Sequence, residues 1–239
     1  MIQERLVGYI EQSIRQNWRI EALSNYREPG YSYRQIAEKI LKLHFLFKGA
    51  GIEEGDKIAL VGRNSANWCI TYLATVTYGA VIVPILPDFK PDDLMNIINH
   101  SDSKILFVDD KLYESIDLNK LPSITGVISL DDFRMVNSVS HSFKSSFESV
   151  EERYEKKYPD LKQEDIKFSD VTNDKLAVIS YTSGTTGFSK GVMISHNSLA
   201  CNVRFAQNNM PLEPGDPVVS FLPLAHTYGC AFEFLFPFT

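Results

Sequence analysis

The stretch Tyr181-Thr-Ser-Gly-Thr-Thr-Gly-Phe-Ser-Lys-Gly191 places four hydroxyl side chains around two internal glycines and ends on Lys190 and a further glycine. Glycines let the backbone turn several amides toward one point, hydroxyls add donors, and lysine adds positive charge. A concavity with these groups suits a polyphosphate. The stretch therefore predicts a loop that holds the phosphates of a nucleotide.

The segments on both sides of this loop predict an α/β fold. Residues 175–181 form an apolar run that reads as a strand buried on both faces, and residues 191–194 are again typical of a strand. Upstream, apolar runs alternate with amphipathic stretches; the expected strands are 56–61, 79–85, 104–108 and 125–129, and the expected helices 2–18, 32–47, 64–78 and 91–100. Downstream, Ser195 or Asn197 opens a helix through Phe205, and residues 218–222 are predicted to form another strand. Such alternation is typical of a parallel sheet covered by helices on both faces.

Residues 131–170 differ from the rest of the chain. They are polar and charged, with few apolar positions, and we predict an exposed insertion or linker that is helical over residues 147–158 and otherwise mobile. This pattern divides the chain into a first α/β subdomain, residues 1–170 with the insertion near 131–170, and a segment 171–239 that carries the phosphate loop and begins the next subdomain.

Composition excludes several classes of protein. The formal net charge of −6 argues against sequence-independent nucleic-acid binding, so no nucleic-acid partner is expected. Three scattered cysteines suggest a reducing compartment, and no Cys-x-x-Cys or His-Glu-x-x-His motif supports a zinc site. The start of the chain lacks a signal-peptide pattern, and no apolar run is long enough to span a bilayer. These features predict a cytoplasmic protein.

Three other interpretations of the loop are weaker. A Walker loop needs glycine before the lysine, where Ser189 stands, and a hydroxyl residue after it, where Gly191 stands. The run 187–191 also fits the Gly-x-Ser-x-Gly elbow of α/β hydrolases, with Asp216 and His226 downstream, but the residues after the serine are typical of a strand rather than a helix. A polar surface turn explains the composition but not so long an ordered motif.

The whole stretch resembles the signature loop of the adenylate-forming superfamily, which includes acyl-CoA synthetases, peptide-synthetase adenylation domains and luciferases. That pattern continues into a β run and Ser/Thr-His-x-Asn/Ser-Leu, as in Val192-Met-Ile-Ser-His-Asn-Ser-Leu199 here. Ser189 replaces the usual proline, which loosens the backbone without removing a phosphate-facing donor. Further resemblances are found at 31–36, at 55–65 with Trp68, at 79–84 and at 221–229.

The resemblance implies the N-terminal part of the large domain of an adenylate-forming enzyme, with layered parallel sheets flanked by helices. It implies an AMP-forming long-chain fatty acid–CoA ligase that uses ATP and Mg²⁺ and takes coenzyme A as a substrate. By resemblance, the β- and γ-phosphates of ATP are held by Thr182, Ser183, Gly184, Thr185, Thr186, Gly187 and Lys190. His226, expected at the start of a helix, is the candidate catalytic residue beside the acyl carboxylate. The apolar run that follows, 230–236, is either the wall of an acyl tunnel or part of the core.

Members of this superfamily are more than twice as long as these 239 residues. Their magnesium, adenine and ribose motifs and their mobile lid would follow residue 239, so we expect an N-terminal fragment that has no turnover alone. An exposed apolar end at 231–239 would drive self-association, and peripheral contact with a membrane is a further expectation. The expected ligands are fatty acid, ATP and coenzyme A. An acyl-carrier-protein or other acid–thiol ligase, or a non-catalytic acyl- or nucleotide-binding module, is the alternative.

Overall fold

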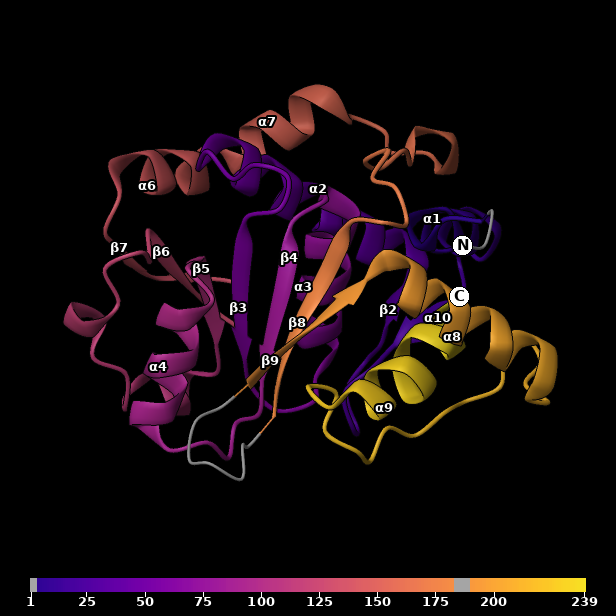
Figure 1. The fold of residues 1–239 in the computed structure, drawn as a ribbon. Helices are drawn as coiled ribbons and strands as arrows, with labels where there is room; N and C mark the ends of the chain where they lie inside the picture. Colours follow the sequence, from indigo (N-terminus) through magenta and orange to yellow (C-terminus); the bar gives the residue numbers. More distant parts are fainter. Residues whose placement is uncertain (1–3, 183–189) are drawn as a thin grey trace.

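The structure of the protein, a computed structural model, describes residues 4–182 and 190–239. Its centre is a sheet with strand order β7-β6-β5-β3-β4-β8-β9 (Figure 1). The strands of this sheet are β3 Lys57–Val61, β4 Val81–Ile85, β5 Ser103–Val108, β6 Gly126–Ser129, β7 Met135–Ser138, β8 Leu176–Thr182 and β9 Lys190–Ser195. The five inner strands, β6, β5, β3, β4 and β8, are parallel to one another. The edge strands β7 and β9 are antiparallel to their neighbours. The predicted α/β fold is confirmed, with antiparallel strands at both edges.

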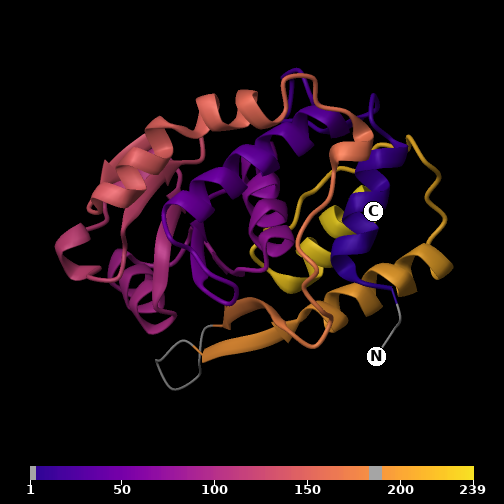
Figure 2. The same cartoon turned by 90° about the horizontal axis from the view of Figure 1, so that it is seen from above.

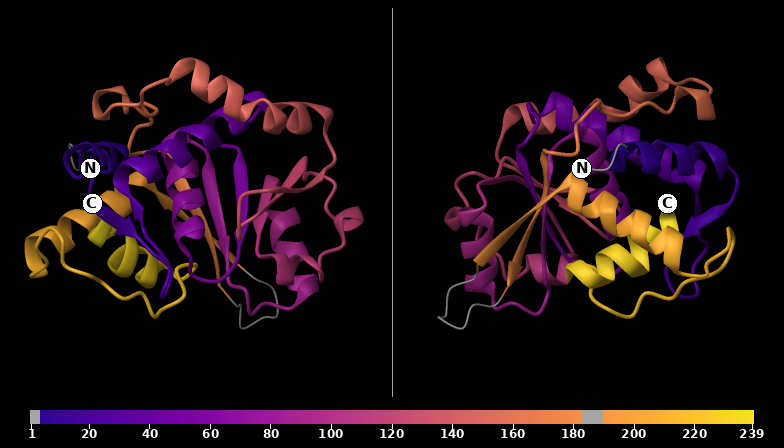
Figure 3. Two further views of the ribbon diagram at one scale, coloured as in Figure 1. Left: turned by 180° about the vertical axis from the view of Figure 1, so that it is seen from behind. Right: turned by 45° about the vertical axis from the view of Figure 1, so that its right-hand side comes forward.

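The other elements cover this sheet or connect its strands. The α-helices are α1 Leu6–Gln16, α2 Tyr33–Gly49, α3 Ala66–Tyr78, α4 Pro91–His100, α5 Asp110–Tyr113, α6 His141–Glu148, α7 Val150–Lys157, α8 His196–Asn209, α9 Thr227–Gly229 and α10 Phe236–Phe238. Shorter elements are the 3-10 turns η1 Leu118–Lys120 and η2 Gln163–Asp165, the π-helical segment η3 Cys230–Leu235, and a hairpin of β1 Glu21–Leu23 with β2 Tyr31–Ser32. Figure 2 shows α2 and α3 on one side of the sheet and α4 on the other, and Figure 3 shows α1, α8 and the last helices gathered at one end.

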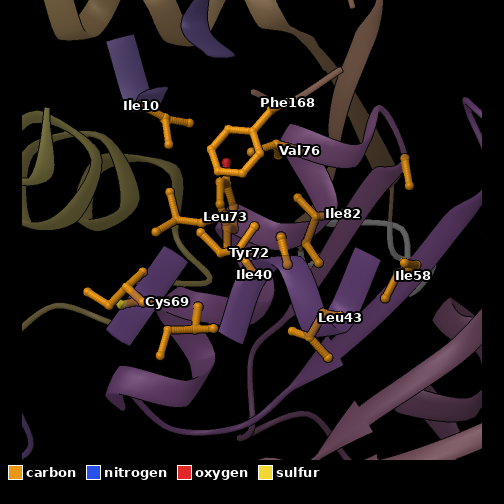
Figure 4. Packing of buried hydrophobic residues seen from close by; sticks show 14 of the residues in the cluster. Ile10, Ile40, Leu43, Ile58, Cys69, Tyr72, Leu73, Val76, Ile82 and Phe168 are labelled. Atoms are coloured by element: carbon orange, nitrogen blue, oxygen red, sulfur yellow. The ribbon is translucent and has the colours of Figure 1, made fainter. Parts of the chain in front are cut away.

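Alternating side chains of the strands supply two cores. In β3, Ile58 and Leu60 point toward α2 and α3, while Ala59 and Val61 point toward α4. Figure 4 shows the first of these cores, in which Ile58 and Ile82 of the sheet meet Leu43 and Val76 of the helices. Both faces of the central strands are buried, which explains why these strands are continuous apolar runs in the sequence.

Local capping signals place the helix starts. The Ser32 hydroxyl accepts a hydrogen bond from the Gln35 amide, and the Gln35 side chain accepts one from the Ser32 amide, which confirms the predicted capping box. The Ser65 and Ser195 hydroxyls cap α3 and α8 by accepting from the backbone amides of Trp68 and Ser198, without the reciprocal bond. In each case the cap fixes where a helix leaves the sheet.

Residues 131–170 are not the exposed insertion predicted from their polarity. They add strand β7 to the edge of the sheet and lay α6 and α7 across α2. Phe143 is fully buried over Gly126, where an added Cβ would lie 2.1 Å from the phenyl ring. The apolar residues of this stretch are few, but Phe143 and Tyr154 are buried in the core to which α2 contributes. The predicted helix at 147–158 corresponds to the end of α6 and to α7.

The C-terminal part of the chain corrects two further predictions. Residues 218–222 are not a strand, and Val219 and Phe221 are exposed in an extended segment before α9. The apolar end is not exposed, because Phe234, Phe236 and Phe238 are buried. The prediction of self-association rested on an exposed apolar end, which the structure does not show. Self-association itself stays an untested prediction. The division at residue 170 also stays a prediction; strands from both sides of it lie in one sheet.

Side chains near the start of the chain hold residues near its end. The Ser13 hydroxyl and the Tyr33 hydroxyl both donate to the carbonyl oxygen of Phe238, at 2.6 and 2.8 Å. The Tyr33 and Phe238 rings also lie 4.8 Å apart. In the described part of the chain, no helix combines the length and apolarity needed to cross a bilayer.

Candidate functional site

The hairpin of β8 and β9 carries the residues on either side of the predicted phosphate loop. β8 runs beside β4 with Val178 paired to Ile82, so its first residues are buried in the sheet. β9 returns antiparallel to β8, and the last two register pairs are Tyr181 with Gly191 and Thr182 with Lys190. In Figure 1 the two strands cross the lower half of the molecule together.

Thr182 and Lys190 are brought together at the end of this hairpin. Both are exposed and directly opposite each other in the register. The other predicted phosphate ligands, Ser183, Gly184, Thr185, Thr186 and Gly187, lie outside the described residues, so their role stays a prediction. A hydroxyl donor and an ammonium group side by side are suited to binding an anion.

The hairpin end lies at the edge of the sheet where ligands bind in open α/β folds. β3, β4 and β8 are parallel neighbours, so their carboxyl ends meet at one edge. A hollow of about 320 Å³ opens there, lined by Gly62, Arg63, Asn64, Pro87, Asp88, Phe221, Pro223 and Ala225. The loops after β3 and β4 lead to helices on opposite faces of the sheet, and the crevice between such strands is a common ligand site.

His226 lies on the segment that forms one wall of this hollow. It is exposed at the start of α9, as predicted, and its Nδ1 accepts a hydrogen bond from the Tyr228 amide at 3.3 Å. With Nδ1 as acceptor, the neutral ring carries its proton on Nε2, which can donate to a carboxylate. The structure therefore places His226 near the same sheet edge as Thr182 and Lys190, but no contact joins it to either residue.

Asn64 and Glu233 hold the segment that leads to His226. The Asn64 amide donates to the Leu222 carbonyl at 2.8 Å, and its oxygen accepts from the Leu224 amide at 2.9 Å. The Glu233 carboxylate accepts from the Leu222 amide at 2.9 Å. The sequence pattern predicts only a capping role for Asn64. Its partners lie 158 and 160 residues away, so no local pattern identifies them.

The apolar run after His226 packs as core. Phe234 meets the edges of Trp68 and Tyr72, with ring centroids 6.3 and 5.7 Å away, and Cys230 is buried nearby with a pKa raised to about 12 by burial. These contacts favour the core interpretation of residues 230–236 over an acyl tunnel.

Comparison with known proteins identifies related sequences. A family profile described as "AMP-binding enzyme" matches residues 10–239. Probable acyl-activating enzyme 16, chloroplastic, from Arabidopsis thaliana is 29% identical over 227 residues, which are 90% of this chain and 31% of that protein. Long-chain-fatty-acid–CoA ligase 5 from Rattus norvegicus is 28% identical over 85% of this chain and 32% of its own length. Long-chain-fatty-acid–[acyl-carrier-protein] ligase AEE15, chloroplastic, from Arabidopsis thaliana is 28% identical over 90% of this chain and 31% of its own length.

A solved structure shares the fold. The anthranilate CoA ligase AuaEII in complex with anthranoyl-AMP superposes with a TM-score of 0.80 at 19% identity, over 98% of this chain and 42% of that one. At this identity the likeness is one of fold alone. The chain thus spans about a third of the length of the curated relatives it matches.

Proposed function

Because the chain belongs to the family of AMP-binding enzymes, we propose that it forms the nucleotide-phosphate part of a ligase that activates a fatty acid with ATP and transfers the acyl group to coenzyme A. The observation that carries this proposal is the pairing of Thr182 with Lys190 at the carboxyl edge of the sheet. A long-chain substrate is supported by the names of two relatives at 28 and 29% identity, long-chain-fatty-acid–CoA ligase 5 and long chain acyl-CoA synthetase 5.

The reaction joins a carboxylate oxygen to the α-phosphorus of ATP and expels pyrophosphate. Two anions approach each other in this step, so fixed donors and positive charge lower its barrier. We assign Lys190 and Thr182 to the β- and γ-phosphates, together with Ser183, Gly184, Thr185, Thr186 and Gly187. His226 would donate from Nε2 to the acyl carboxylate. Mg²⁺ would arrive with ATP and would neutralise part of the negative charge on its phosphates. The thiol of coenzyme A would then displace AMP from the acyl-adenylate.

Replacing Lys190 with alanine is expected to raise the dissociation constant for ATP about tenfold, because a charge-assisted hydrogen bond to phosphate is lost. Isothermal titration of ATP into the purified chain measures this change. Lys175→Ala is the matched control, since Lys175 is also exposed but precedes β8 and pairs with Glu54. Equal ATP affinity in Lys190→Ala and the wild type would remove Lys190 from the proposed site.

The 239-residue chain is expected to show no fatty-acid-dependent exchange of pyrophosphate into ATP, because it spans about a third of its relatives' length. The assay follows labelled pyrophosphate with palmitate present and absent. Exchange by this chain alone would show that these residues suffice for adenylation and would contradict the expectation.

An acyl-carrier-protein ligase is the main alternative, and the chloroplastic acyl-carrier-protein ligase among the relatives favours it. A non-catalytic acyl- or nucleotide-binding module is the other. Offering coenzyme A and acyl carrier protein in parallel to a longer chain that contains these residues separates the two ligases. If that longer chain formed no acyl-adenylate, the result would favour the module.

A cytoplasmic location, supported by three unpaired cysteines, and peripheral membrane contact stay proposals. Cell fractionation tests the first, and vesicle flotation tests the second.

A further inference from the structure

His100 lies at the base of the β8–β9 hairpin although it belongs to a different part of the chain. It is the last residue of α4, and its Nδ1 lies 2.6 Å from the hydroxyl oxygen of Tyr181. The two rings meet edge to face, with centroids 5.7 Å apart and planes at 86°. A single side-chain contact therefore links the end of α4 to the residue that precedes Thr182.

Tyr181 connects His100 to both strands of the hairpin, because it belongs to β8 and its ring lies against Gly191 of β9. Its ring is buried in the core on the α4 side of the sheet, next to Ile179. Gly191 is its partner in the register, and a Cβ added there would lie 3.2 Å from Tyr181 Cζ and 2.9 Å from Ile179 Cγ2. The ring thus rests against the bare backbone of Gly191, and it fits there because Gly191 has no side chain.

This arrangement orders the final pair of the hairpin. The ring of Tyr181 touches both strands at the register pair next to that of Thr182 and Lys190, and His100 holds that ring at its hydroxyl end. α4 is itself anchored by Leu94, Met95, Ile97 and Ile98, all of which are buried in the same core. A rigid helix is therefore coupled to the direction in which Thr182 and Lys190 leave the sheet.

We infer that His100 is a positioning residue for the nucleotide-phosphate site: its hydrogen bond to Tyr181 holds Thr182 and Lys190 in the geometry that binds ATP. The inference rests on the proposed function for the ligand and on described contacts for the positioning. His100 itself does not touch the phosphates. Its removal should weaken ATP binding by displacing two ligands rather than by removing one.

The test uses the 239-residue chain with His100→Ala, Tyr181→Phe and the double variant. Tyr181→Phe keeps the ring over Gly191 and removes only the hydroxyl, so it isolates the hydrogen bond. Each single variant should raise the dissociation constant for ATP about fivefold, the effect of one hydrogen bond. The double variant should bind no more weakly than the singles, because both changes break the same bond. His100→Gln, which can still bond the hydroxyl, should recover most of the affinity, and His141→Gln on α6 serves as the histidine control.

A second measurement follows the hairpin without ATP. Amide hydrogen exchange at Thr182 and Lys190 should be about fivefold faster in His100→Ala and Tyr181→Phe than in the wild type. A purely structural bond would instead lower the melting temperature and leave ATP affinity unchanged, and that result would overturn the inference. Additive losses in the double variant, or unchanged exchange at both amides, would also overturn it. A wild-type chain that binds neither ATP nor inorganic pyrophosphate would refute the phosphate site, while the exchange measurement would still decide whether His100 orders the hairpin.

Discussion

Replacing Trp68 with alanine is expected to lower the free energy of unfolding by about 4 kcal/mol, the usual cost of removing a large aromatic side chain from a packed core. Trp68 is 0% exposed in α3, stacks on Tyr72 with centroids 5.6 Å apart, and meets Phe234 edge-on. The indole therefore joins α3 to the π-helical segment η3 near the end of the chain. Urea unfolding followed by circular dichroism at 222 nm measures the loss.

The chain contains its own control for this substitution. Trp18, the other of its two tryptophans, is half-buried after α1 and packs only partly against the same core. Trp18→Ala should cost about 1–2 kcal/mol, because less of its apolar surface is buried. If both variants lost the same free energy of unfolding, the contact of Trp68 with Phe234 would not stabilise the packing of α3 against η3.

Lowering the pH from 6.5 to 4 is expected to reduce the free energy of unfolding by about 3 kcal/mol through His196 alone. His196 is 1% exposed, and burial lowers its pKa from 6.5 to about 4. In this pH window the unfolded chain takes up a proton that the folded chain cannot, so acid favours unfolding by up to about 1.4 kcal/mol per pH unit. His44, whose pKa burial also lowers to about 4, adds to this loss over the same window.

His196→Leu should flatten this pH dependence. Within the described residues, neither ring nitrogen of His196 has a hydrogen-bond partner. An apolar side chain of similar size should therefore leave stability at pH 7 unchanged or raise it. Unfolding free energies of the wild type, His196→Leu and His141→Gln at pH 7, 6, 5 and 4.5 give the slopes. A wild-type slope in His196→Leu would exclude His196 as the group that titrates.

Much of the fold is predictable because its signals are local. The strands 57–61 and 176–182 are apolar runs, and the starts of α2, α3 and α8 follow serine caps that bond within their own first turn. Residues 218–222 mislead for the opposite reason. They are rich in strand-forming residues, but the backbone carbonyl and amide of Leu222 bond the side chains of Asn64 and Glu233 rather than a neighbouring strand.

The candidate site is predictable only where its residues follow one another in the chain. Thr182 and Lys190 belong to one motif, and the position of His226 at a helix start follows from the residues before it. The contact between His100 and Tyr181 joins residues 81 apart, and the burial of Phe143 depends on Gly126 of β6. Such pairings depend on the order of strands in the sheet, which hydrophobic periodicity does not specify.

The two hydroxyls that hold the Phe238 carbonyl have a consequence for biosynthesis. Ser13 lies 225 residues before its partner, so α1 is synthesised long before the carbonyl group that this hydroxyl binds. The α/β centre between β3 and β6 is complete in sequence by residue 129 and can form earlier. During translation α1 can therefore pack against α2 early, whereas the hydrogen bonds that tie both helices to Phe238 form only after residue 238 has been made.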